Sequence, residues 1–163
     1  MFFFEMILMG VWATFVMDAL AIVLSKLKLI RPKIGPEIIG RWSIYMLRGK
    51  FVHKDIHSTP AMPNEILISW ISHYSIGILL AGVYLLVEEI YPVIADQFWM
   101  AIIFGILTLV LPWLWLFPSI GIGFWASKMS QKSPYIITSL VNHTDFGLGL
   151  ALWIIVFRPI FAY

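Results

Sequence analysis

The sequence predicts an all-α integral membrane protein, a four-helix bundle of two similar helix hairpins with a short amphipathic helix in its first connection. Three observations predict this class. Residues of the AVILMFWYC set make up 61% of the 163 positions, charged residues make up 12%, and the mean hydropathy is +0.91. A soluble domain is typically about half apolar and about one-quarter charged, so this chain cannot cover a water-facing surface. The many Trp, Tyr and Phe residues suit the headgroup regions of a bilayer.

Four apolar runs are long enough to cross a bilayer, because a span takes roughly twenty helical residues. They lie near residues 2–24, 66–87, 98–117 and 135–157. The first run lacks a basic start and an A-x-A-like cleavage site, so we expect a retained helix rather than a signal peptide. We treat residues 1–163 as a single membrane domain with a long connection at 25–65.

The connections between these runs differ in the sign of their charged residues. The second connection carries only acids, and the third carries only the bases Lys128 and Lys132. Because basic loops stay in the cytoplasm, we expect the first and third connections inside and both termini outside, with Arg158 as a mild exception. The basic loop at 26–54 is also expected to attract anionic headgroups. The charges of the first connection are Lys26, Lys28, Arg31, Lys33, Arg41, Arg48, Lys50 and Lys54 against Glu37, Asp55 and Glu65, and those of the second are Glu88, Glu89 and Asp96.

A short amphipathic helix is predicted within this first connection, after Pro32 and Pro36. Between Glu37 and Gly49, apolar side chains recur at helical spacing on one face, while Arg41 lies off that face. The stripe consists of Ile38, Trp42, Tyr45 and Met46. Two placements stay open, because both bury the same stripe: a helix lying in the cytoplasmic interface, or a helix covering the end of the bundle.

The second and fourth runs share a four-residue frame. Each carries a serine, a histidine, a glycine and an alanine at steps of four, which lie close to one helix face. Small residues at this spacing let helices approach closely in lipid and explain the frame except for its histidines. Two related helix hairpins would account for the repeat. The matching positions are Ser69, His73, Gly77 and Ala81 against Ser139, His143, Gly147 and Ala151, with Gly10, Thr14 and Asp18 as a related stripe in the first run.

Four ionisable side chains are expected at nearly one depth: Asp18, His73, His143 and Asp145. Counted from the cytoplasmic edge at about 1.5 Å per residue, all lie roughly 10–15 Å deep. Such groups are costly in lipid, so carboxylate and imidazole are expected to pair, with Thr14 extending the network. Asp145 lies about 200° around the helix from His143, so the two need not share a pocket.

Four interpretations of this layer stay open. The first, which we prefer, is a proton or ion site formed by Asp18, Thr14, His73, His143 and Asp145. The second is a bis-histidine haem b site, in which His73 and His143 are ligands and Gly77 and Gly147 leave room for the ring. The third is a divalent metal site of Asp18, His73 and His143. The fourth is a hydrogen-bond network that only holds helix register.

Other classes of function find little support in the sequence. No G-x-S-x-G, H-E-x-x-H or Gly-rich phosphate loop is present, and the absence of Cys excludes thiol chemistry and disulfides. A formal charge of +2 is too small to indicate nucleic acid. The loop sequence from His53 to His57 reads HKDIH, which more often is solvated or bound to lipid phosphate than to a metal. An accessory subunit of a larger membrane complex and a homo-oligomer are left open.

An ordered set of residues along the chain matches a known pattern. It consists of Thr14, Asp18, Gly40, Arg41, Trp42, His53, Ile56, Pro60, Glu65, Trp70, His73, Tyr74, Gly77, Pro112, Pro118, Gly121, Gly123, His143 and Phe146 to Leu150. By these residues, and over most of its length, the chain resembles a bacterial inner-membrane family known only as domain of unknown function 2938. The resemblance implies a small multi-span protein of the inner membrane and brings no activity, substrate or catalytic residue with it. Asp145 and the Lys-rich 26–33 stretch are not part of it.

Overall fold

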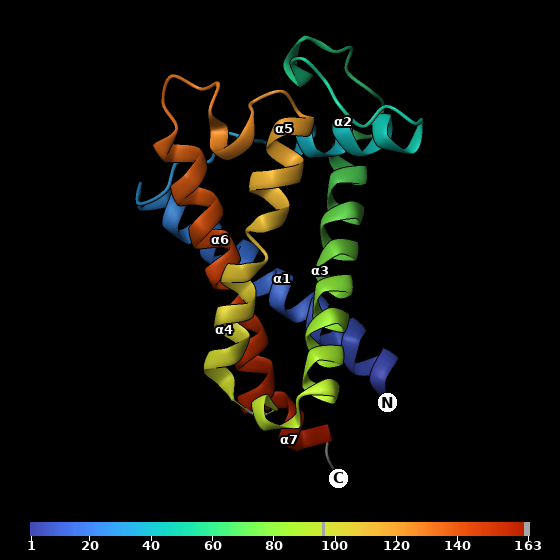
Figure 1. Ribbon diagram of the computed structural model, residues 1–163, viewed down its shortest axis with the longest axis vertical. Helices are drawn as coiled ribbons and strands as arrows, with labels where there is room; N and C mark the ends of the chain where they lie inside the picture. Colours follow the sequence, from blue (N-terminus) through green and yellow to red (C-terminus); the bar gives the residue numbers. More distant parts are fainter. Residues whose placement is uncertain (96, 162–163) are drawn as a thin grey trace.

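Four long apolar helices dominate the computed structural model, which describes residues 1–95 and 97–161. The candidate spans are Phe2–Lys26, Glu65–Ile90, Phe98–Ser119 and Ser133–Ile160. They pack as a bundle (Figure 1), which confirms the predicted all-α class and the four runs of the sequence. Each is long and apolar enough to cross a membrane, so the chain has the architecture of a multi-pass membrane protein.

The elements follow one another along the chain with short connections except after the first span. The first two spans are continuous α-helix, whereas the third and fourth each contain a π-turn. In order, the elements are α1 (Phe2–Lys26), α2 (Pro36–Leu47), η1 (Ile56–Ser58), α3 (Glu65–Ile90), η2 (Pro92–Ile94), α4 (Phe98–Leu107), the π-turn η3 (Pro112–Leu116), α5 (Phe117–Ser119), η4 (Phe124–Ala126), α6 (Ser133–Leu152), the π-turn η5 (Trp153–Phe157) and α7 (Arg158–Phe161).

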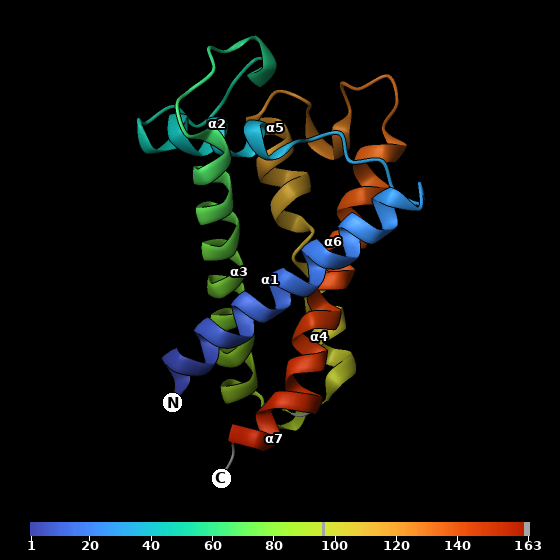
Figure 2. The same cartoon turned by 180° about the vertical axis from the view of Figure 1, so that it is seen from behind.

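Helix α1 crosses the bundle diagonally and packs against both α3 and α6 (Figures 1 and 2). Glycines make these crossings close. A Cβ at Gly10 would meet the backbone of Ile78 in α3, and a Cβ at Gly149 would lie 2.6 Å from the Cα of Ala13. Because lipid supplies no hydrophobic drive between helices, such backbone approach is what holds spans together.

The third span is broken near its middle. Helix α4 ends at Leu107, a turn follows at Thr108, and the helix resumes as a π-turn that begins at Pro112. Proline has no N–H to continue the ladder and its ring clashes with the preceding turn, which explains the break at this place. The break leaves Thr108 facing α6 inside the bundle, where it is 6% exposed.

Helix α2 lies across one end of the bundle and packs on α3 (Figure 1). Ile38 and Trp42 of the predicted stripe are buried, whereas Tyr45 and Met46 are partly exposed. The buried face joins a second apolar cluster with Ile56 and residues after the third span. Helix α2 therefore forms within the predicted residues and covers the end of the bundle. Its position in a membrane interface stays a prediction.

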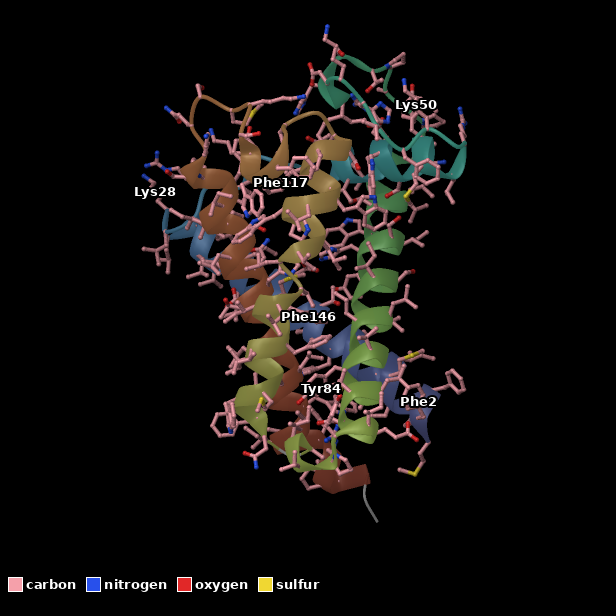
Figure 3. The ribbon with its side chains drawn as sticks, viewed as in Figure 1. Phe2, Lys28, Lys50, Tyr84, Phe117 and Phe146 are labelled. Atoms are coloured by element: carbon pink, nitrogen blue, oxygen red, sulfur yellow. The ribbon has the colours of Figure 1, made fainter. Side chains whose placement is uncertain are left out.

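The start of α1 and α7 lie at one end of the bundle, and the loops that carry Lys28 and Lys50 lie at the other (Figure 3). Tyr84 belongs to a core cluster at the end near α7, and Phe117 belongs to the cluster under α2. Phe146 lies between them (Figure 3). Asp96, one of the acids used to orient the chain, lies outside the described residues.

Candidate functional site

A pocket of about 440 Å³ lies between all four spans, below α2. It is lined from α1, from α3, from the π-turn η3 and α5, and from α6. Its roof is formed by Trp42 of α2 and by the segment from Pro32 to Pro36. The pocket therefore occupies the half of the bundle that carries the basic loops, and the helix break at Pro112 contributes one of its walls.

Asp18 and His73 form a hydrogen-bonded pair on the wall of this pocket. The Nε2 atom of His73 lies 3.1 Å from Oδ1 of Asp18, so an Nε2–H group donates to the carboxylate. The side chains are 36% and 21% exposed for His73 and Asp18. The other carboxylate oxygen, Oδ2 of Asp18, is buried and has no hydrogen-bond partner. One oxygen of the carboxylate is thus held by imidazole, and Tyr74 of α3 also interacts with this carboxylate.

His143 hydrogen-bonds to the broken third span rather than to Asp18. Its Nδ1 atom lies 2.6 Å from Oγ1 of Thr108, and the same hydroxyl donates to the carbonyl oxygen of Gly105 at 2.6 Å. A hydroxyl has a single proton to donate, so both contacts are satisfied when Nδ1 of His143 carries a proton and donates to Thr108. The neutral ring then keeps Nε2 as an acceptor.

Further polar atoms in the pocket wall have no hydrogen-bond partner. They are Oγ1 of Thr138, Oγ of Ser139 and Oδ1 of Asn142, all from α6 and all buried. A buried polar group without a partner costs on the order of 1–3 kcal/mol, so water or a polar occupant is favoured here. Together with Asp18, these atoms form a polar patch inside an otherwise apolar and aromatic pocket.

The residues that the sequence singled out do not all meet. Asp18, His73 and His143 line the same pocket. Thr14 lines it as well, but its hydroxyl donates to a backbone carbonyl one turn earlier in α1, at 2.8 Å. Asp145 does not line the pocket, and its Oδ2 atom is buried without a hydrogen-bond partner.

The two glycines of the haem hypothesis serve helix packing. A Cβ at Gly77 would meet Oγ1 of Thr14, and a Cβ at Gly147 would lie 2.8 Å from the Cα of Ile102. No free space for a flat ring therefore lies beside either glycine. For a metal, no group of three His, Asp or Glu side chains comes together within residues 1–95 and 97–161.

The repeated frame occupies comparable surroundings in the two halves. His73 bonds to a side chain of α1, and His143 bonds to Thr108, which follows α4. Gly77 packs on α1, and Gly147 packs on α4. Each histidine is thus hydrogen-bonded to the span that precedes its own span in the chain. The duplication of two hairpins itself stays a prediction.

Sequence reasoning missed the roof of the pocket and its aromatic wall. Trp42, Trp70 and Trp115 line the pocket from three different elements, and the rings of Trp42 and Trp115 meet edge to face at 5.4 Å. The prolines at 32 and 36 were taken only as chain breaks, yet they bring this segment over the pocket. Aromatic residues at membrane depth were the available signal, but in lipid they are too common to be specific.

A polar network anchors the roof to α3. Arg41 donates to both carboxylate oxygens of Glu65, at 2.6 and 3.1 Å, and to the carbonyl oxygen of Thr59 at 3.1 Å. The hydrogen bond to Glu65 raises the pKa of Arg41 above its ordinary value. Bidentate pairing of this kind fixes geometry as well as charge. The network therefore holds α2 and the start of α3 in register.

The HKDIH loop is an ordered part of this cap. His53 is 3% exposed, its backbone N–H donates to the carbonyl oxygen of Ser119 at 2.7 Å, and its ring meets that of Tyr45 at 5.1 Å. Burial, and then the charge of Lys50, lower the pKa of His53. Asp55 accepts from the backbone N–H of His57 at 3.0 Å. His53 is thus packed rather than solvated, which differs from the preferred interpretation of this loop.

A second ionic cluster closes the opposite end of the bundle. Arg158 donates to Glu5 at 2.8 Å and to both carboxylate oxygens of Glu88, at 3.2 and 2.7 Å. Arg158, which was an exception to the charge pattern, therefore ties α7 to α1 and α3. Glu5, near the start of α1, is one of its partners.

Comparisons with known proteins identify a family and nothing closer. Residues 7–156 match the family described as Protein of unknown function (DUF2938). No curated protein and no solved structure shows significant similarity to the chain. The match covers all four spans almost completely, including the pocket described above.

Proposed function

The chain belongs to the DUF2938 family, and we propose that it is a membrane carrier that moves a small solute or ion through the pocket between its spans, coupled to a proton. The observation that carries the proposal is the Asp18–His73 pair on the pocket wall, with Oδ2 of Asp18 unpartnered. The haem and metal hypotheses have less support, because Gly77 and Gly147 are packed against neighbouring spans and the described residues bring no three metal-ligating side chains together. A purely structural network does not account for the pocket beside the pair.

Protonation changes the charge of the Asp18–His73 pair, and the low polarity of the pocket increases the effect of this charge on binding. With a neutral imidazole the pair carries one negative charge; with an imidazolium it carries none. In a partly buried site of low dielectric constant, that difference strongly affects what can bind beside it. A solute that binds one protonation state better must shift the equilibrium toward that state, which is the thermodynamic basis of coupling.

The broken third span supports a transport role. Transporters commonly bind their substrates where a span is discontinuous near the bilayer midplane, because unwound backbone is tolerated only where it lines a cavity. Here Pro112 opens the π-turn η3 and itself lines the pocket. Local π-turns are also frequent at functional sites.

We further propose that the protein lies in a bacterial inner membrane with both termini outside. The end of the bundle that carries Lys28 and Lys50 would then face the cytoplasm, as basic loops do. Lysines and arginines at 26–54 would contact anionic headgroups there. Cysteine-scanning accessibility of Lys50→Cys and Glu89→Cys in intact cells tests this orientation, since only the second is expected to react with an impermeant thiol reagent.

The proposed coupling is tested in acid-loaded proteoliposomes that contain a trapped pH indicator. The probes added outside are sodium, potassium and choline chlorides, sodium lactate, and neutral glycerol. At least one probe is expected to change the internal pH in vesicles with the wild-type chain and not in protein-free vesicles. Asp18→Asn and His73→Gln are expected to abolish that change while the protein still folds.

Asp145→Asn is the matched control, since it also removes a carboxylate at membrane depth but lies off the pocket. It is expected to retain the wild-type proton signal. If no probe moves protons, or if Asp145→Asn behaves as Asp18→Asn does, the carrier proposal fails. Loss of folding in both pocket variants together with no wild-type signal would favour a structural role for the pair.

A further inference from the structure

One carboxylate lies in the wall of the pocket, while Lys33 at its roof is exposed to solvent. Among the described residues that line it, Asp18 contributes a carboxylate, and no other Asp or Glu does. His73 holds one oxygen of that carboxylate, while Oδ2 is buried and has no partner. A positively charged occupant would be attracted to this carboxylate and a negatively charged one repelled, whereas a neutral occupant would gain no charge–charge interaction.

The pocket wall also presents indole rings. Trp42, Trp70 and Trp115 all line it, and the ring centroids of Trp70 and His73 lie 6.3 Å apart. Trp is the aromatic side chain whose face attracts a cation most strongly, and cages of such rings beside a carboxylate are a known way to bind quaternary ammonium groups. The aromatic wall therefore favours the same charge as Asp18.

The pocket is large enough for a small organic ligand. Its volume of about 440 Å³ falls in the usual range for small organic ligands. The described residues bring no three metal-ligating side chains together. The unpartnered hydroxyls of Thr138 and Ser139 and the amide oxygen of Asn142 instead suit a hydroxyl or N–H group on an organic molecule.

We propose that the pocket binds a compact organic cation with a single positive charge, such as a small quaternary ammonium compound, in exchange for one proton. The cation lies beside the Asp18 carboxylate and the indole rings, and the proton leaves His73. This assignment rests on the proposed function and names its class of substrate. One charge enters and one leaves, so the net charge of the site is unchanged.

The other charged and titratable groups around the pair are compatible with this exchange. His143 faces the pocket from α6, and its Nδ1 atom is engaged by Thr108 of the third span. Tyr135 of α6 also lines the pocket, and Tyr74 lies beside His73 on α3 with ring centroids 6.0 Å apart. Lys33 lines the roof but is exposed to solvent, where its charge is screened.

Binding is tested on the purified full chain by quenching of its tryptophan fluorescence. The probe is choline, and the control is 3,3-dimethylbutan-1-ol, a neutral molecule of nearly the same shape. Choline is expected to quench saturably and to bind at least tenfold more tightly than the neutral analogue. Asp18→Asn is expected to weaken choline binding at least tenfold, and Asp145→Asn to leave it unchanged.

Proton release is measured in the same samples with a pH indicator in weak buffer. About one proton per bound choline is expected where His73 is protonated, and there the affinity falls about tenfold per unit decrease in pH. In His73→Gln the pH dependence is expected to disappear while choline still binds. Equal binding of the neutral analogue, or competition by lactate, would overturn the assignment.

The proteoliposome experiment separates the two proposals. If sodium or lactate moves protons in an Asp18-dependent way and choline does not, the substrate class is wrong and the carrier function stands. If choline binds with proton release but no probe moves protons across the membrane, the substrate class stands and the carrier function is wrong. If choline neither binds nor moves protons, the organic-cation assignment is refuted.

Discussion

Replacing Glu88 by Gln removes the carboxylate that accepts two hydrogen bonds from Arg158 at the end of the bundle opposite the pocket. The side chains are 8% and 20% exposed, so the pair is poorly screened by solvent. Removing one partner of a buried ion pair costs about 3–5 kcal/mol. Because Gln keeps one oxygen acceptor and Arg158 keeps Glu5, we expect a loss of about 2–3 kcal/mol in the free energy of unfolding.

The neighbouring carboxylates allow matched comparisons. Glu5 accepts from Arg158 at 2.8 Å and is 26% exposed, so Glu5→Gln is expected to cost about 1 kcal/mol. Glu89, beside Glu88 on the same helix, is exposed, and Glu89→Gln is expected to change stability little.

The assay is thermal unfolding in detergent, followed by tryptophan fluorescence. For a chain of this size, 2–3 kcal/mol corresponds to a decrease of about 4–12 °C in Tm. A Glu88→Gln variant that melts with the wild type would refute the reasoning, as would a Glu5→Gln variant that is the less stable of the two. Either result would mean that apolar packing, rather than the ionic cluster, holds α7 against α1 and α3.

Three further predictions concern the helix crossing and the cap. Gly77→Ala is expected to cost about 1–3 kcal/mol, because its Cβ would meet a buried Thr14 whose hydroxyl is already bonded. Gly82→Ala is the control, since its Cβ meets only the flexible end of Met6, and equal melting of the two variants would contradict the argument. Burial lowers the pKa of His53, so the unfolded chain binds more protons than the folded one, and stability should be lost as pH falls from about 7.5 to about 5. His53→Phe should flatten this dependence of Tm on pH, and an unchanged slope would show that other groups cause it. Arg41→Lys is expected to cost about 1–2 kcal/mol, because Lys cannot reproduce the bidentate bond to Glu65, and wild-type stability in this variant would argue against the role of that bond.

Much of the fold was predictable because hydropathy alone identifies spans. The runs at 2–24, 66–87, 98–117 and 135–157 differ from the observed helices by only a few residues at their ends. The helix after Pro36 was predictable from the spacing of its apolar residues. In both cases the signal is local, since it depends on residues within one helix and not on what that helix touches.

The sequence predicted that three residues of the candidate site meet, but it did not predict how they pair. Counting residues from the membrane edge placed Asp18, His73 and His143 at one level, and all three line one pocket. The same counting could not tell that Asp18 bonds to His73 while His143 bonds to Thr108. That choice depends on how each helix is rotated about its axis and on the break before Pro112, and neither follows from composition.

The amino-acid sequence therefore determined the apolar character of this protein and the number of its candidate spans, because both follow from the length and composition of the apolar runs. Tertiary structure decided the rest. Close contacts at Gly10, Gly77 and Gly105 set the helix crossings and rotations, and these select the side chains that meet. The pocket, its roof from α2 and the partners of Asp18 and Arg158 are consequences of contacts between segments that are distant in the chain.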